Sequence, residues 1–215
     1  MTHDFLERLE FSEGVDLGDA ILEHLRNSIP GSIAVEKTTK QEDKQGTDYW
    51  IKRLDLPPIS VDVKHRSFDP IEKFGSDDAC IETTSVYVGP PEPPWLNKFR
   101  KKPGWTIDST KRTDLVVYTW PTDNGKRRFW IVYFPHLCSV AQRHWSTWAA
   151  KYGEKSARND GYLTLSVYPP RAEIAKTIQE IIEGRILEHN QNAKQHPVEF
   201  LEIKWEPMGQ GQMLT

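Results

Sequence analysis

Two neighbouring runs of β-branched and aromatic residues, separated by a Leu-Pro-Pro sequence, constrain the fold of this chain more than any other feature. The pattern predicts two strands joined by a tight connection at the prolines. The second run, residues 59–64, reads Ile-Ser-Val-Asp-Val-Lys, so its apolar side chains should point to one face and its polar ones to the other. Asp62 and Lys64 therefore share one face, and the preceding run supplies a third polar group, Asp48.

Two carboxylates and a lysine at this spacing suit the hydrolysis of a phosphodiester. Carboxylates on neighbouring strands can bind a hard divalent cation such as Mg²⁺ through their oxygen atoms. The cation would polarise the phosphoryl oxygen and lower the pKa of a bound water. A lysine on the same face could orient that water or offset the charge that builds on the phosphate. By itself, an Asp-x-Lys sequence on a strand is also typical of an ordinary solvated sheet face.

These residues resemble the motif of the PD-(D/E)xK nuclease superfamily, which has the restriction-endonuclease-like fold. Asp48 matches the first acid, Asp62 the second and Lys64 the lysine, whereas Thr47 stands where the family name has proline. The resemblance covers roughly the first two-thirds of the chain. It implies a metal-dependent deoxyribonuclease, acting as an endonuclease or an exonuclease, whose Mg²⁺ or Mn²⁺ is bound by Asp48, Asp62 and the backbone carbonyl of Val63. Lys64 would position the attacking water.

A second stretch, residues 104–118, is similar to sequences in phage and bacterial nuclease families of this fold. In those families a Gly-Trp pair, then a lysine and an aspartate, precede an apolar strand, and Lys111 and Asp114 match the latter two here. The similarity implies that Lys111 lies near the phosphate. Asp114 could instead be a capping or structural acid at the head of the strand.

Two glutamates are further candidates for the metal site. In some branches of the superfamily a glutamate on the first helix completes the site, and Glu23 lies on the helix predicted for residues 16–28. A surface glutamate is the more ordinary interpretation of Glu23. Glu82 lies on a predicted strand, where it could ligate or orient the metal while Thr84 contacts phosphate. An edge strand with ordinary polar residues explains that pattern equally well.

Basic and aromatic residues around a proline-rich segment, residues 89–94, suit contact with DNA. Interleaved rings and cations can bind a nucleic-acid backbone or an unstacked base. A surface loop whose lysine stems pack on the protein explains the same residues without a ligand. The candidates for nucleic-acid contact are Arg66, Thr84, Lys98, Arg100, Lys101, Trp105 and Lys111.

Composition places few limits on this interpretation. The 215 residues are 37% hydrophobic and 27% charged, as in an ordinary globular domain. The formal net charge of −3 counts mildly against a nucleic-acid binder, although a local basic patch can serve. No apolar run is long enough to cross a bilayer, and the sequence has no Gly-rich phosphate loop. We therefore expect neither a membrane partner nor a nucleotide cofactor.

The two cysteines, Cys80 and Cys138, have neither metal-ligand spacing nor the pattern of a disulfide framework. Each lies in an apolar setting, which predicts buried free thiols. Together with an N-terminus that lacks the pattern of a secretory signal, this predicts a cytoplasmic location. The resemblance to phage and bacterial nucleases implies that the cell is a bacterium or a phage-infected host.

The pattern along the chain predicts one nuclease-like domain, residues 1–215, of the α/β class. We expect a mixed central β-sheet flanked by helices, with a core of residues 16–152, a C-terminal strand-helix-strand extension over 153–208 and a tail over 209–215.

The alternative function is a catalytically inactive module of the same fold that binds nucleic acid or a protein partner. A homodimer is compatible with either function. The remaining elements are expected as helices over 137–152 and 171–190 and as strands over 32–37, 115–120, 128–134, 162–167 and 198–205.

Overall fold

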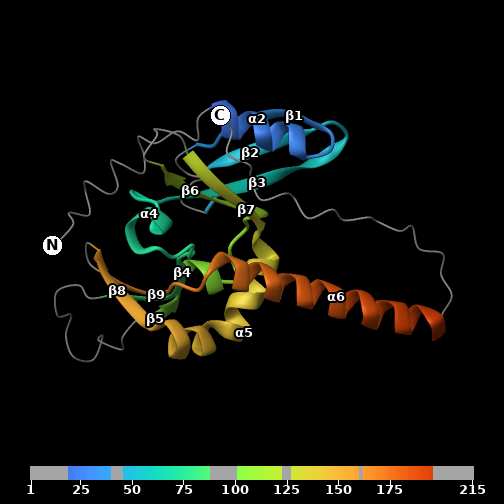
Figure 1. Cartoon of the computed structure of the whole chain (residues 1–215). Helices are drawn as coiled ribbons and strands as arrows, with labels where there is room; N and C mark the ends of the chain where they lie inside the picture. The colour runs from blue at the N-terminus through green and yellow to red at the C-terminus, as the bar shows by residue number, and fades with distance from the viewer. Residues whose placement is uncertain (1–18, 40–45, 88–100, 123–126, 160–161, 196–215) are drawn as a thin grey trace, which may run out of the picture.

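A computed structural model of the chain describes residues 19–39, 46–87, 101–122, 127–159 and 162–195. Within these residues it shows two β-sheets and four α-helices (Figure 1). The expected α/β class with a mixed sheet is confirmed. The strand expected over 198–205 and the tail expected over 209–215 lie outside the described residues.

The first sheet is mixed and contains the strands that carry Asp62 and Lys64. Its central strand, β3, pairs in parallel with β6, whereas the other neighbours in the sheet are antiparallel. The order is β1 (Ser32–Lys37), β2 (Tyr49–Arg53), β3 (Leu56–His65), β6 (Leu115–Pro121) and β7 (Arg127–Tyr133).

The second sheet is antiparallel and differs from the expectation of one central sheet. Its order is β5 (Lys101–Pro103), β4 (Ile81–Tyr87), β9 (Tyr162–Val167) and β8 (Glu154–Asn159). The strand that carries Glu82 was expected in the one central sheet, but it pairs with β5 and β9. Residues after 153 therefore belong to the same sheet as β4. The sequence did not predict this sheet, because strand pairing between distant segments leaves no local pattern in the sequence.

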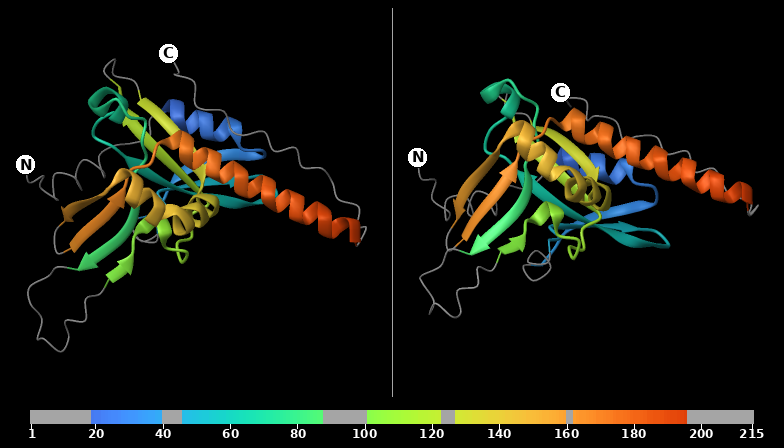
Figure 2. Two further views of the ribbon diagram at one scale, coloured as in Figure 1. Left: turned by 60° about the horizontal axis from the view of Figure 1, so that its bottom comes forward. Right: turned by 90° about the horizontal axis from the view of Figure 1, so that it is seen from below.

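Hydrophobic clusters cover both faces of the first sheet. On one face, Ile21 and Leu25 of α2 (Asp19–Ser28) pack with Val61 and Val63, and α2 ends before Pro30 and Gly31. On the other face, β6 packs with α5 (Phe134–Tyr152) and with the second sheet. The α5 helix and the first turns of α6 (Arg171–Gln195) lie between or beside the two sheets, and α6 then extends away from the body (Figure 2). No helix in the described residues is long and apolar enough to cross a membrane.

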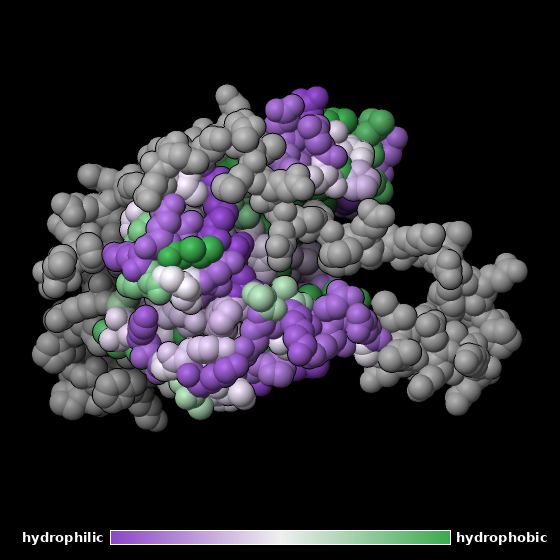
Figure 3. All heavy atoms as spheres, viewed as in Figure 1, coloured by the Kyte–Doolittle hydropathy of each residue, from purple (hydrophilic) through white to green (hydrophobic). Residues whose placement is uncertain are grey.

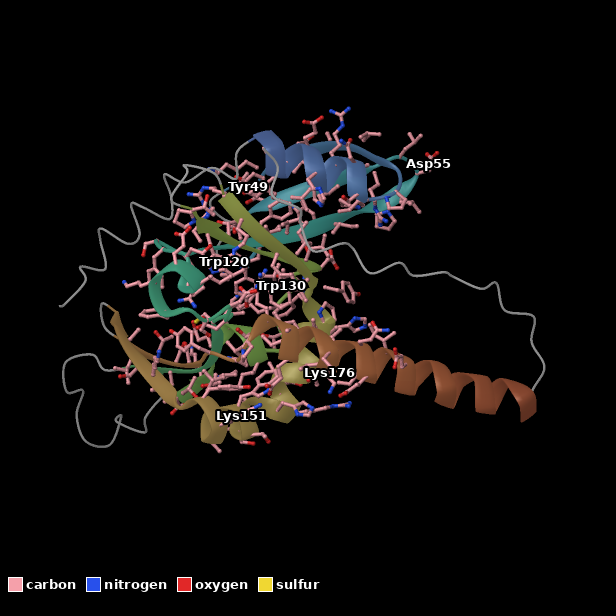
Figure 4. All side chains as sticks on the ribbon, viewed as in Figure 1. Tyr49, Asp55, Trp120, Trp130, Lys151 and Lys176 are labelled. Atoms are coloured by element: carbon pink, nitrogen blue, oxygen red, sulfur yellow. The ribbon has the colours of Figure 1, made fainter. Side chains whose placement is uncertain are left out.

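Strand β3 alternates as predicted, but the turn before it lies elsewhere. The β2–β3 turn is at Leu54 and Asp55, with Asp55 at a positive φ of 54° at the far tip of the hairpin (Figure 4). Pro57 and Pro58 belong to β3 itself. They are accommodated because β6 pairs with β3 only from Val61 onward, so a missing N–H there breaks no bond to β6.

An ionic and aromatic network joins the first sheet to α6 and to the segment before β4. Asp77 accepts hydrogen bonds from Arg128 on β7 at 2.9 Å and from Arg171 on α6 at 2.8 Å. Arg128 also pairs at 2.6 Å with Asp69, whose carboxylate caps the short helix α4 (Pro70–Phe74). The two arginines lie over the ring of Trp120, which Figure 4 shows on the side of the first sheet that faces α6.

Candidate functional site

Asp48, Asp62 and Lys64 lie together at the carboxyl-terminal part of β3. The Lys64 ammonium donates to Oδ1 of Asp62 at 3.0 Å and lies 2.9 Å from its Oδ2. Asp48 precedes β2, and its backbone N–H donates to the carbonyl of Val61 at 2.8 Å. Its carboxylate then accepts a hydrogen bond from the N–H of Val63 at 2.6 Å. The strand pairing therefore holds the first acid beside the segment that carries the second acid and the lysine.

The two carboxylates are close enough to perturb each other. Burial raises the pKa of Asp48, and the neighbouring charge of Asp62 raises it further, to about 6. The N–H of Val63 and the ammonium of Lys64 oppose this rise without cancelling it. A second cation between the two carboxylates would stabilise the ionised form of Asp48.

Lys64 stays charged, and Asp62 retains capacity for another ligand. Burial alone would lower the pKa of Lys64, but the charge and hydrogen bond of Asp62, with smaller contributions from Asp48 and Glu82, raise it overall. The side chain of Asp62 is only 3% exposed, whereas that of Lys64 is 37% exposed. Oδ2 of Asp62 is buried, and the Lys64 ammonium, 2.9 Å away, does not approach it in hydrogen-bond geometry. A buried carboxylate oxygen without a hydrogen bond is a candidate metal ligand.

Trp105 and Glu82 form one wall of the site. The Trp105 ring lies over the Lys64 ammonium, 4.1 Å from ring centre to nitrogen. Glu82 accepts hydrogen bonds from the backbone N–H of Trp105 at 3.2 Å and from the Ser85 hydroxyl at 2.9 Å. Glu82, expected as a metal ligand or orienting group, thus holds the segment that carries Trp105, while its charge still acts on Lys64.

The two carboxylates supply oxygen atoms, the kind of ligand that Mg²⁺ prefers. Within the described parts of the chain, no group of three or more histidine, cysteine, aspartate or glutamate residues is arranged to hold a metal. Mg²⁺ is commonly held by one or two carboxylates and completes its shell with water and phosphate oxygens. The unbonded oxygen of Asp62 and the raised pKa of Asp48 are the features that favour a cation here.

The candidates Glu23 and Thr84 have different surroundings. Glu23 is exposed on α2, and α2 covers the face of the sheet opposite to Asp62. Thr84 lies on β4 of the second sheet and is only 7% exposed. The site that the structure assembles therefore draws on the segment before β2, on β3 and β4, and on the 3₁₀ turn η1 (Trp105–Ile107), without α2.

The basic candidates for nucleic-acid contact have different surroundings. Arg66 follows β3 on the same side as Lys64 and pairs with Asp78 at 3.5 Å. The stem of Lys111 and the indole nitrogen of Trp105 both lie near Gly46, just before β2. Lys101 belongs to β5, and Lys98 and Arg100 lie outside the described residues.

Asp114 has a structural role. Its Oδ2 accepts hydrogen bonds from both the N–H and the hydroxyl of Ser60, each at 2.8 Å. In return the N–H of Asp114 donates to the Ser60 hydroxyl at 2.9 Å. This aspartate therefore attaches the start of β6 to β3, and so sets the parallel pairing that supports the site.

Comparison with protein-family models found no match, and comparisons with curated proteins and with solved structures found no significant match.

Proposed function

We propose that this chain is a metal-dependent deoxyribonuclease in which Asp48, Asp62 and Lys64 carry out phosphodiester hydrolysis. One observation carries the proposal: the buried carboxylate of Asp62 and the partly buried carboxylate of Asp48, which precedes the neighbouring strand, interact beside a lysine that remains charged. Of these carboxylates, Asp48 has a raised pKa and Asp62 has an oxygen without a hydrogen bond. Two neighbouring ionised carboxylates repel each other and destabilise the folded protein unless a bound cation offsets the repulsion, so such pairs are typical of functional sites.

Each residue has a role that follows from its surroundings. Asp48, Asp62 and the backbone carbonyl of Val63 would hold Mg²⁺ or Mn²⁺, which supplies Lewis-acid activation of the phosphate when bound. Lys64 acts as a charge rather than as a base, because its pKa is raised. Its ammonium would orient the attacking water and stabilise the additional negative charge on the phosphate. Trp105 restricts the direction of the ammonium.

A catalytically inactive binding module is the second candidate. It is favoured by the number of carboxylates, since the described residues contain no group of three or more potential metal ligands. The contact between Lys64 and Asp62 would then be a buried ion pair with no catalytic role. Both candidates share the fold, so only an activity measurement separates them.

The test is a nuclease assay on linear, circular, single-stranded and branched DNA. Wild type is compared with Asp62→Asn and Lys64→Ala in Mg²⁺ or Mn²⁺, with and without EDTA. We expect metal-dependent cutting that falls by about 100-fold or more in both variants, the usual effect of removing one charge-stabilising group. Asp55→Asn, at the exposed tip of the β2–β3 hairpin, is the matched control and should cut like wild type. Absence of cutting on every substrate would leave the binding module.

A further inference from the structure

Three aromatic rings and three cations alternate on the surface around α4; we call this the α4 surface. The Lys73 ammonium lies 4.1 Å from the centre of the Phe68 ring and 5.5 Å from that of Phe74. On the other side of Phe74, Lys155 of β8 lies 5.7 Å from the Phe74 ring and 5.0 Å from that of Tyr168. Arg66 lies 5.0 Å from the Tyr168 ring and 5.8 Å from the Phe68 ring.

The outermost ring of the α4 surface is available to a ligand. Phe74 is 58% exposed, and Ile71 beside it on α4 is 43% exposed. Figure 3 shows an apolar patch over α4 that hydrophilic surface encloses. Packing of α4 on the protein accounts for Phe68, which meets Phe74 edge to face at 5.4 Å, but it does not require an exposed ring flanked by two lysines.

The charge of this surface suits a polyanion. Two acidic residues lie close to these cations: Asp78 pairs with Arg66, and Glu72 lies exposed on α4. The cations Arg66, Lys73 and Lys155 outnumber these two acids. The remaining acids near α4, Asp69 and Asp77, are already bonded to two further cations, Arg128 and Arg171. A surplus of positive charge therefore remains here in a chain of formal net charge −3.

The α4 surface continues from the candidate catalytic site along one strand. Arg66 comes two residues after Lys64 and four after Asp62, on the same side of the sheet. At the rise of an extended chain, Arg66 is about 13 Å from Asp62. A strand of DNA lying on the α4 surface would therefore reach Asp62 and Lys64 within a few nucleotides.

We propose that the α4 surface binds unpaired nucleotides of single-stranded DNA. A base would stack on Phe74, and the ammonium groups of Lys73 and Lys155 would contact the phosphates on either side. Exposed rings flanked by cations bind single strands in this way, because every base has an aromatic face and every nucleotide a negative charge. The inference rests on the proposed nuclease function, for which it names the substrate class.

The test measures binding of a fluorescent oligothymidylate of about 20 nucleotides, longer than the site size of common single-strand binding modules. A blunt duplex of the same length is measured in parallel, and all binding is followed by fluorescence anisotropy in EDTA. We expect tighter binding of the single strand than of the duplex. Phe74→Ala should weaken single-strand binding by about 5- to 150-fold, the effect of losing one stacked base, whereas Phe74→Tyr should retain it.

The lysines are tested through the salt dependence of binding. Replacing both Lys73 and Lys155 by alanine should reduce the slope of log affinity against log salt by about 1.4, because each phosphate contact to a single strand contributes about 0.7. The matched controls are Trp145→Ala, an exposed ring on α5, and Lys176→Ala, an exposed lysine on α6 (Figure 4). Neither control should change affinity or slope.

Wild-type affinity in Phe74→Ala, an equal loss in Trp145→Ala, or a preference for the duplex would each overturn the inference. Because the assay contains EDTA, its outcome is independent of cutting. A protein that binds single strands through Phe74 but cuts no DNA would refute the nuclease proposal alone. A protein that cuts DNA and binds single strands equally well without Phe74 would refute this inference alone.

Discussion

The ammonium group of Lys64 lies 4.1 Å from the centre of the Trp105 ring, so the two β-sheets share one site. Lys64 belongs to β3 of the first sheet. Trp105 belongs to η1, which Glu82 of the second sheet holds through a hydrogen bond to its backbone. The orientation of Lys64 toward Asp62 therefore depends on how the second sheet packs against the first.

Gly104 should be intolerant of any side chain. A Cβ atom there would lie 2.5 Å from the backbone carbon and oxygen of Glu82, which cannot move without distorting β4. We expect Gly104→Ala to destabilise the protein by about 1–3 kcal/mol, as overpacking usually does. Urea unfolding measures this loss, and tryptophan fluorescence reports the displacement of Trp105.

Gly184→Ala is the control for Gly104→Ala. Gly184 lies in α6, and a Cβ atom there would meet nothing within 4 Å. Alanine should be neutral or stabilising by up to about 1 kcal/mol, because it is the better helix former. If both substitutions had the same effect, the close approach of Gly104 to Glu82 would not be the cause.

Metal binding should depend on Asp62 but not on Glu82. The Glu82 carboxylate is already bonded to Trp105 and Ser85, whereas Oδ2 of Asp62 has no hydrogen bond. At a Mg²⁺ concentration of 100 times Kd, wild type should gain about 2.7 kcal/mol of stability. Thermal unfolding with and without Mg²⁺ should show this gain in Glu82→Gln but not in Asp62→Asn. Loss of the gain in Glu82→Gln would instead make Glu82 a metal ligand.

The free energy of unfolding of the metal-free protein should depend on pH because of Asp48. The folded-state pKa of about 6 exceeds the ordinary value of 3.8, so the folded protein holds the proton more tightly than the unfolded chain. Ionised Asp48 therefore costs stability above about pH 6 and nothing below about pH 4. Relative to wild type, Asp48→Asn should gain up to about 3 kcal/mol between these values. Urea unfolding in EDTA across this range measures the gain.

Asp108→Asn should show the opposite trend. Although partial burial acts to raise the pKa of Asp108, hydrogen bonds from the hydroxyl and N–H of Thr110 outweigh it and lower the pKa. Its contribution to stability is present above the ordinary pKa of an aspartate and is lost as the pH falls. The free energy of unfolding of wild type should therefore increase relative to that of Asp108→Asn as the pH rises. Parallel trends in the two variants would show that general charge, not the local surroundings, controls the result.

Asp77→Ala should loosen α6 from the first sheet. Asp77 bonds both Arg128 and Arg171, whose side chains are 15% and 17% exposed, so its removal leaves two partly buried cations less well paired. We expect a loss of about 1–3 kcal/mol, reduced from that of a fully buried pair because Asp77 is itself 39% exposed. Hydrogen exchange should accelerate at the start of α6. Glu180→Ala, which breaks an exposed pair with Lys176 on the same helix, should cost less than about 0.5 kcal/mol.

Local patterns in the sequence were sufficient for the elements nearest to the site. The alternation of residues 59–64 placed Val61 and Val63 in the core beneath α2 and Asp62 with Lys64 on the opposite face, and the structure confirms this. The strand predicted over 32–37 and the helix predicted over 137–152 are also present, the latter beginning three residues earlier. These predictions succeed because side-chain periodicity is a property of a single strand or helix.

The sequence by itself determined which residues of β3 face the core and which face the site, because the period of a strand follows from its own backbone. Only the tertiary structure decided that β4 pairs with β9, that β8 is a strand although Glu154–Asn159 has almost no apolar residues, and that the turn falls at Asp55 rather than at the prolines. It also decided that Glu82 holds Trp105 over Lys64. Those features depend on contacts between segments far apart in the chain, whose energy no local pattern records.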